Sequence, residues 1–409
     1  MRKIWKSLDA LKGRLPKGKQ DEFGEELPVG QAVKQVTRRD FFRWSGLGFA
    51  VGLASGCDTK KAQKALSYLE AKEGLIPGTD LWYATTCPGC SAGCGALAKT
   101  RDGRPIKLEG NPEHPLSQGG LCAVGQAQIR ALYDSERLQA PMKGGSAATW
   151  ADLDRDLIAR FQDVKNRGGR VRVLSGTLTS PSQRRAIQRF LGGFKEGQHV
   201  TYDALSQAAI PAAYERTHGV RILPHFKLEE ASYLLGVEAD FLGTWINPAG
   251  FGRAYASRRS ADGKRPLSKH VQVESGLSLT GSNADERLRV APSEAVAFLE
   301  HLSAAVERLA GINASGPQRT LEAKLQGRVH DLAEGLWHAK GESLVLCGLN
   351  DVHAQIFAAR LNRALGNEGR TLDLANPGLQ KQGDDAALQA LIKEMGEGQV
   401  DALLLLDAN

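Results

Sequence analysis

The segment Cys87-Pro-Gly-Cys-Ser-Ala-Gly-Cys94 places three cysteines on one short stretch, and Cys122 follows after twenty-seven intervening residues. Three thiolates from a tight loop and a fourth from a distant turn are a typical ligand set for a cubane iron–sulfur cluster. Glycines stand beside these cysteines, where they let the backbone approach sulfur closely. The pattern therefore predicts a 4Fe–4S cluster bound by Cys87, Cys90, Cys94 and Cys122.

Two other interpretations of the four cysteines stay open on sequence grounds. Cysteines of an exported protein can form disulfides, and four cysteines can hold zinc. Disulfides do not need glycine-rich clustering, and zinc sites usually contain a second C-x2-C pair, which this sequence lacks. A fifth cysteine, Cys347, follows an apolar run before a turn, which predicts a packed core thiol.

The N-terminal region predicts export. Arg38 and Arg39 precede Phe-Phe and an uncharged, mostly apolar run over residues 44–56, which is too short to span a bilayer as a helix. This order is typical of a twin-arginine signal, the route for folded proteins. Small residues before Cys57 resemble a lipoprotein cleavage box, so Cys57 is the candidate lipidation site. The expected location is the periplasmic face of the inner membrane; the alternative is a short buried helix beginning at Arg43.

Charge and composition bound the class of protein. The chain has 409 residues, 42% of them hydrophobic, which fits a globular protein with more than one domain. Its net charge is +7, but residues 1–56 carry +5 of this, so the remainder is nearly neutral. With 6% aromatic residues and no basic stripe, nucleic acid is not an expected partner.

The four cysteines fall in an expected small β-rich lobe, residues 81–141. Asp102-Gly103 lies between two strand-like segments and predicts a β-hairpin. His114 stands in Asn-Pro-Glu-His-Pro, where it could tune a cluster; we interpret it instead as a turn residue, because the surrounding prolines explain it fully.

From residue 142 onward, apolar runs alternate with amphipathic segments. Expected strands cover 171–175, 231–236, 270–273, 343–346 and 402–406, and expected helices cover 181–191, 294–309, 354–365 and 386–395. This alternation predicts a doubly wound, mostly parallel α/β domain with helices on both faces. No G-x-G-x-x-G follows a strand, so NAD is not indicated.

The last expected strand has a buried character and no covering helix after it. We therefore expect the α/β domain to be incomplete at the C-terminus, as a fragment or as one half of a split protein. In chain order, the expected organisation is a leader extension (1–37), a twin-arginine signal (38–57), a linker (58–80), the 4Fe–4S lobe (81–141) and the α/β domain (142–409).

Several motifs together resemble the dimethyl-sulfoxide-reductase superfamily, in its polysulfide and tetrathionate reductase branch. The matching segments of its N-terminal cluster domain are 87–94, 103–115, 120–126 and 132–138. The resemblance implies a molybdopterin-oxidoreductase-type α/β fold and a 4Fe–4S cluster. In catalytic molybdenum members the residue two after the fourth cysteine is usually Lys or Arg, whereas this sequence has Val124.

A narrower resemblance links the chain to the large iron–sulfur subunit of alternative complex III. Its segments are 201–206, 239–245 and 277–285, with Trp5–Leu8 in the long leader. This resemblance implies an electron-transfer or scaffold subunit of an exported, membrane-associated, quinol-oxidising complex. Expected partners are a further iron–sulfur domain or chain and a quinol-binding membrane subunit. Members of this family generally lack molybdenum, and many have lost the cysteines that this sequence keeps.

The alternative is a catalytic molybdopterin oxidoreductase acting on polysulfide, thiosulfate or tetrathionate, truncated or split. It would use molybdopterin guanine dinucleotide, which Val124 argues against. The sequence singles out no catalytic residue and no molybdenum ligand.

Overall fold

The structure, a computed structural model, describes residues 76, 78–260, 265–313 and 315–408. These residues belong to one compact unit. Arg38, Arg39 and Cys57, which carry the targeting predictions, lie outside the described residues. No helix in the described ranges has the length and apolar character needed to cross a bilayer.

The N-terminal part is a three-stranded antiparallel sheet in the order β1-β2-β3. Its strands are β1 (Asp80–Thr86), β2 (Gly95–Arg101) and β3 (Arg104–Gly110). Asp102 and Gly103 connect β2 to β3 with φ angles of 48° and 76°, both positive, as a two-residue type I′ turn requires. The predicted hairpin is therefore confirmed. The short helices α4 (Ala123–Ala127) and η1 (Gln128–Leu132) follow.

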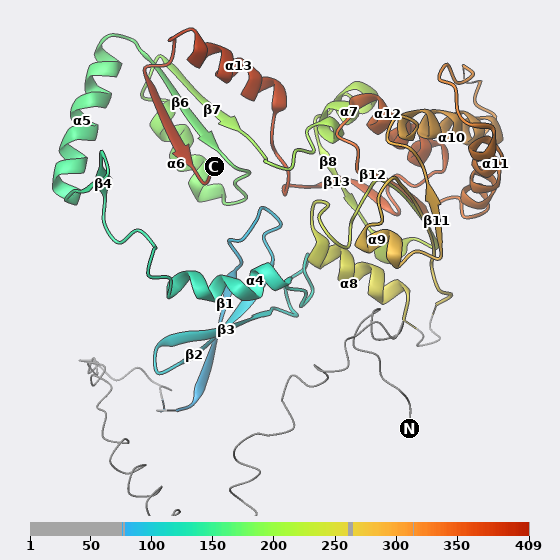
Figure 1. Cartoon of the computed structure of the whole chain (residues 1–409), viewed down its shortest axis with the longest axis horizontal. Coiled ribbons are helices and arrows are strands. Elements are labelled where there is room, and N and C mark those ends of the chain that lie inside the picture. The colour runs from blue at the N-terminus through green and yellow to red at the C-terminus, as the bar shows by residue number, and fades with distance from the viewer. Residues whose placement is uncertain (1–75, 77, 261–264, 314, 409) are drawn as a thin grey trace, which may run out of the picture. The chain divides into compact units, whose positions relative to one another are not determined.

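The first parallel sheet has the order β14-β6-β7. Its strands are β6 (Arg170–Ser175), β7 (Glu196–Thr201) and β14 (Ala402–Leu406), with α5 (Trp150–Asn166), α6 (Pro181–Leu191) and α13 (Asp385–Gly396) around them (Figure 1). Val171 and Val173 of β6 pack in one core with residues of α5 and α6. Arg172 points to the opposite face, because side chains alternate along a strand, and pairs there with Glu394 of α13 at 2.8 Å.

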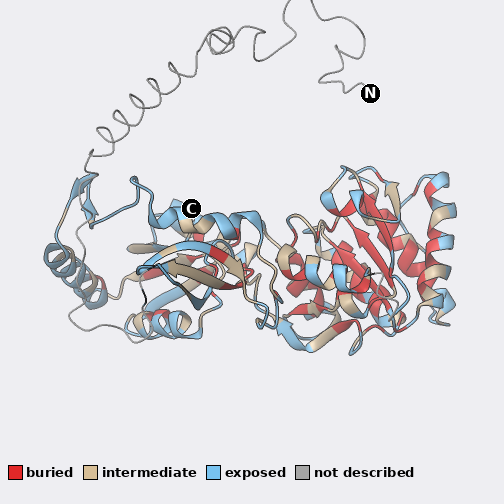
Figure 2. Cartoon of the chain, turned by 90° about the horizontal axis from the view of Figure 1, so that it is seen from below, coloured by how far each residue is buried: buried red, intermediate tan, exposed pale blue. Residues whose placement is uncertain are grey.

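The second parallel sheet has the order β11-β10-β9-β12. Its strands are β9 (Tyr233–Val237), β10 (Lys269–Glu274), β11 (Glu286–Arg289) and β12 (Ser343–Cys347). One core joins the sheet to α10 (Ala295–Leu309), α11 (Ala323–His338) and α12 (Val352–Ala364). A second core joins it to α7 (Ala209–His218), α8 (Pro248–Arg258) and the antiparallel pair β8 (Leu223–Phe226) and β13 (Leu372–Gly378). Figure 2 shows that buried residues concentrate in this part of the chain.

The remaining described elements are short. They are β4 (Met142–Lys143), β5 (Ser146–Ala147), η2 (Leu228–Glu230) and α9 (Leu279–Ser282).

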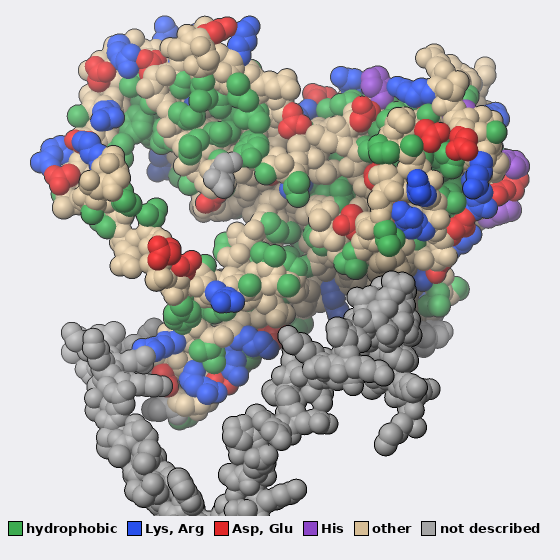
Figure 3. All heavy atoms as spheres, viewed as in Figure 1, with side chains coloured by type: hydrophobic (Ala, Val, Ile, Leu, Met, Phe, Trp, Pro, Cys, Tyr) green, Lys and Arg blue, Asp and Glu red, His purple; other side chains and the backbone are tan. Residues whose placement is uncertain are grey.

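The predicted α/β architecture, with helices on both faces of parallel strands, is confirmed. The parallel strands form two sheets, however, whereas the alternation of elements suggested one. The strand expected at 402–406 forms as β14, and its residues are half-buried or exposed. In the described residues β14 pairs with β6 alone, so it is an edge strand, and Leu405 is 62% exposed. Figure 3 shows hydrophobic side chains gathered over this part of the molecule.

Candidate functional site

The loop of the first three cysteines is a closed turn between β1 and β2. The backbone N–H of Cys87 donates to the carbonyl oxygen of Cys94 at 2.8 Å, so the two ends of the loop meet. Gly93 has a φ of +63°, a conformation that residues with a Cβ rarely adopt. Cys87 and Cys94 are buried, whereas Cys90 is exposed. The loop thus directs one of its three thiols to the surface.

The fourth cysteine caps the helix that follows the lobe. Cys122 is the N-cap of α4, and its Sγ accepts a hydrogen bond from the N–H of Gly125 at 3.4 Å. A Cβ built on Gly125 would lie 3.3 Å from Cys87 Sγ, and one built on Gly89 would lie 3.5 Å from the same sulfur. Two glycines therefore let the loop and the helix approach Cys87 closely, which brings Cys122 to the loop.

Cys94 lies within the electrostatic field of the other three thiols. Burial raises the pKa of Cys94 to about 11, and charge on Cys90, Cys87 and Cys122 contributes to the same rise. All five described cysteines are free thiols. In the described ranges no three His, Cys, Asp or Glu side chains are placed as ligands of a single metal ion. Each thiolate around a cubane binds a different iron, so this donor set fits a 4Fe–4S cluster.

His114 and Ser117 support the loop from the adjoining turn. The Ser117 hydroxyl accepts from the N–H of Gly95 at 3.2 Å and lies 3.0 Å from His114 Nδ1. A Cβ on Gly95 would lie 2.5 Å from that of His114, so the histidine packs directly against the residue after Cys94. His114 is thus a turn residue, as expected, that also contacts the cysteine loop. Sequence reasoning missed Ser117, which is fully buried.

A cavity of about 430 Å³ adjoins the cysteine loop. Ala92 and Gly93 of the loop line it, together with Thr179, which precedes α6, and Asn247, which caps α8. Val124, by contrast, does not line this cavity and is 61% exposed.

The remaining described cysteine lies outside this lobe. Cys347 is the last residue of β12, where burial raises its pKa to about 12. Its side chain packs in the core between β12 and the helices α10, α11 and α12. Cys347 is therefore a packed core thiol, as predicted.

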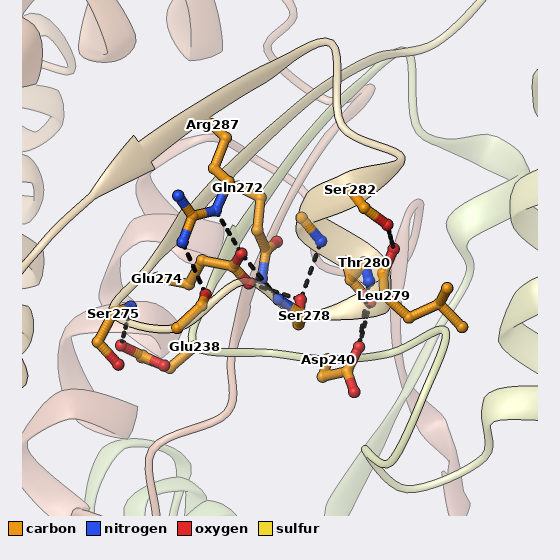
Figure 4. Close-up of polar contacts among 12 residues, drawn as sticks. Glu238, Asp240, Gln272, Glu274, Ser275, Ser278, Leu279, Thr280, Ser282 and Arg287 are labelled. Atoms are coloured by element: carbon orange, nitrogen blue, oxygen red, sulfur yellow. Dashed lines mark hydrogen bonds and ion pairs between the residues drawn. The ribbon is translucent and has the colours of Figure 1, made fainter. Parts of the chain in front are cut away.

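The carboxyl ends of β9 and β10 carry a dense polar network (Figure 4). Buried Glu274, the last residue of β10, accepts hydrogen bonds from Arg287 Nε at 2.6 Å and from the N–H and hydroxyl of Ser278 at 3.1 and 2.5 Å. Asp240 accepts from the N–H and hydroxyl of Thr280 at 3.2 and 2.8 Å. Glu238 accepts from the N–H of Ser275 at 2.8 Å.

This network occupies the edge where doubly wound sheets bind dinucleotides. Burial alone would raise the pKa of Glu274, yet that pKa stays below its usual value because Arg287 and Ser278 stabilise the carboxylate. A Cβ on Gly281 would lie 1.9 Å from Glu274 Oε1, so α9 packs tightly on this carboxylate. The acceptor oxygens of Glu274 are therefore used by the protein itself.

Comparison with known families gives the class of the N-terminal part. Residues 81–134 match the family model of the molybdopterin oxidoreductase Fe4S4 domain. This part of the chain is a domain of that class, and its cofactor is a 4Fe–4S cluster. The match agrees with the expected 4Fe–4S lobe over these residues.

Two curated proteins are similar to a longer part of the chain than the family model is. The chain is 25% identical over 298 residues to "Menaquinone reductase, molybdopterin-binding-like subunit" from Nitratidesulfovibrio vulgaris, covering 69% of this chain and 41% of that protein. It is 25% identical over 214 residues to a nitrate reductase from Klebsiella oxytoca, covering 51% of this chain and 24% of that protein. The chain thus spans less than half the length of these relatives.

A solved structure supports the fold. Acetylene hydratase from Pelobacter acetylenicus superposes with a TM-score of 0.52 at 12% identity, covering 70% of this chain and 44% of that one. This similarity concerns the fold alone, and it confirms the expected molybdopterin-oxidoreductase-type arrangement.

Proposed function

We propose that this chain is an electron-transfer and scaffold subunit of an exported, membrane-associated respiratory complex that oxidises quinol. The convergence of four thiols on one small lobe carries the proposal, since Cys87, Cys90, Cys94 and Cys122 supply the four-cysteine set of a 4Fe–4S cluster. Bound there, the cluster would accept and release one electron. Cys90 and Cys122 are exposed, so the ligand shell reaches the protein surface, where a partner can approach.

The polar edge of the second sheet supports a non-catalytic role. A dinucleotide at this edge would need free acceptors for its ribose hydroxyls, but Glu274 already accepts from Arg287 and Ser278. Glu274 in this arrangement offers no free acceptor to a dinucleotide, which argues against molybdopterin guanine dinucleotide at this position. Val124, which replaces the usual basic residue between cluster and pterin, agrees with this. The α/β body would then serve as a platform for other subunits.

The quinol-linked part of the proposal rests on similarity. The Nitratidesulfovibrio vulgaris relative is named as a molybdopterin-binding-like subunit of a menaquinone reductase. The motif resemblance to alternative complex III points in the same direction. The proposed partners are a further iron–sulfur domain or chain and a quinol-binding membrane subunit. Arg38 and Arg39 would direct export, and Cys57 is the candidate lipid anchor at the periplasmic face of the inner membrane.

Metal analysis of the purified full-length chain tests the proposal. We expect about four irons per chain, as one cubane requires, with neither molybdenum nor pterin. Cys90→Ser should lower the iron content sharply and remove the brown absorbance, whereas the matched control Cys347→Ala should keep both. Stoichiometric molybdenum would contradict the non-catalytic role, and full iron in Cys90→Ser would contradict the ligand assignment.

A further inference from the structure

Helix α6 carries an uncompensated positive charge. Its sequence, Pro-Ser-Gln-Arg-Arg-Ala-Ile-Gln-Arg-Phe-Leu, contains Arg184, Arg185 and Arg189 and no acidic residue. None of these three side chains forms a hydrogen bond or ion pair with any other described residue. Other arginines of the chain, such as Arg172 and Arg360, are held by carboxylates at 2.8 and 2.7 Å. Arg185 and Arg189 are exposed and Arg184 is half-buried, so helix α6 carries guanidinium groups without a described partner.

The arrangement of these arginines has a local cost. Arg185 and Arg189 are four residues apart on one helix, and like charges at this spacing destabilise a helix by about 0.2–0.5 kcal/mol. The surface hollow over the three arginines has a volume of about 670 Å³, and no carboxylate lines it. A protein that only needed solubility could have placed Glu at one of these positions. An anionic surface supplied from outside would remove the repulsion.

The arginine helix begins beside the cysteine loop. A Cβ on Gly93 would lie 4.0 Å from Thr179 Oγ1, and Ser180 is the N-cap of α6. Gly93 and Thr179 also line the same cavity. The charged helix therefore starts next to the loop that exposes Cys90.

We propose that the arginine face of α6, formed by Arg184, Arg185 and Arg189, is the docking surface for an electron-carrier protein with an acidic face. This inference rests on the proposed electron-transfer function. One electron leaves the reduced cluster and reduces the carrier's cofactor, and no bond is formed or broken. Guanidinium groups are suited to this because they bind carboxylates in bidentate fashion and steer an anionic partner toward the site.

Oxidation kinetics of the reduced, iron-loaded full-length chain test the proposal. The probes are one equivalent of ferricyanide, an anion, or of hexaammineruthenium(III), a cation; each takes one electron. Charge reversal in Arg184→Glu/Arg185→Glu/Arg189→Glu should lower the rate of oxidation by ferricyanide about tenfold at low salt and raise the rate of oxidation by the cation. Electrostatic steering changes association rates by at least this much. At high salt the difference should disappear. Poly-L-glutamate, which mimics an acidic face, should slow ferricyanide only with the wild-type chain.

A matched control reverses three exposed basic residues of the second sheet's helices: Arg216→Glu, Lys324→Glu and Arg363→Glu. If this control changes the two rates as much as the α6 variant does, net charge explains the effect and the proposal is overturned. Binding of the wild-type chain to anionic phosphatidylglycerol vesicles, lost in the α6 variant, together with no effect of poly-L-glutamate, would assign the face to a membrane instead. Failure of the chain to bind iron would defeat the proposed function itself, whereas iron-loaded chains with identical rates would defeat only the docking surface.

Discussion

A buried histidine makes the stability of the second sheet depend on pH. His270 of β10 is fully buried, and its Nδ1 lies 3.1 Å from Tyr255 Oη, whose hydroxyl donates to the carbonyl oxygen of Asn283 at 3.0 Å. Burial lowers the pKa of His270 to about 4. The unfolded chain has the ordinary histidine pKa of about 6.5. Between these values the unfolded state takes up a proton and the folded state does not.

The sign and size of the effect follow from this difference. The free energy of unfolding falls as pH decreases through 6.5 and stops falling near pH 4, where the folded state also binds the proton. The full loss is about 3 kcal/mol, and at pH 5.0 it is about 2 kcal/mol, whereas at pH 7.5 there is almost none. Nearby Asp285, whose pKa is lowered by Arg259, adds a loss in the same direction as pH falls.

The substitution His270→Asn isolates the histidine. Asparagine keeps an N–H donor toward Tyr255 and does not titrate, so its own loss of packing applies equally at both pH values. Urea unfolding at pH 7.5 and 5.0 can be followed by tryptophan fluorescence, to which Trp245, buried in the same core as Tyr255, contributes. Between pH 7.5 and pH 5.0, the free energy of unfolding should fall by about 2 kcal/mol more in the wild-type protein than in the variant. The control His330→Asn, at a side chain that is 72% exposed, should behave as wild type. Equal pH dependence in wild type and His270→Asn would refute the reasoning.

Three further predictions concern other parts of the chain. Gly125→Ala should lower the iron content, because the new methyl group would lie 2.6 Å from Leu121 Cδ1 and 3.3 Å from Cys87 Sγ. The control Gly327→Ala, whose methyl group would have no atom within 4 Å, should keep the iron content of the wild type. Equal iron content in the two variants would contradict the close packing around Cys87. Replacing Arg38 and Arg39 with lysines should leave the full-length protein in the cytoplasm, as cell fractionation would reveal, and continued export would disprove the signal assignment. Leu405→Lys should reduce self-association in light scattering, since a charge on an exposed edge strand opposes sheet pairing; unchanged scattering would mean that this edge plays no part.

Local signals explain which elements could be predicted from the sequence. Helix α6 was predicted with the bounds that the structure has, because Ser180 and Pro181 mark its start chemically: the Ser180 hydroxyl accepts from the N–H of Gln183, and proline favours the first turn. Strand β7, Glu-Gly-Gln-His-Val-Thr, was not predicted, since Val200 alone among its side chains is fully buried. It is a strand because it pairs with β6, and pairing is set by tertiary packing.

In the candidate site, too, local features could be predicted from the sequence and tertiary pairings could not. The spacing of Cys87, Cys90 and Cys94 is local, so their loop could be predicted, and glycine content anticipated its close packing. The ion pair between Glu274 and Arg287 joins β10 to β11, and neither residue has a distinctive sequence context. The division of the strands into two sheets depends likewise on which strands meet, which the hydrophobic pattern does not encode.

The pairing of β6 with β14 has a consequence for the order of events at the ribosome. Arg170 N–H donates to Asp401 Oδ2 at 2.7 Å, and these residues are 231 positions apart. At ordinary synthesis rates of about 5–20 residues per second, roughly 12 to 46 s pass before the partner strand of β6 is translated. All strands of the second sheet are made within that interval. The sheet that carries helix α6 is therefore the last part of the described fold to be completed. One edge of β6 stays unpaired until β14 has been translated.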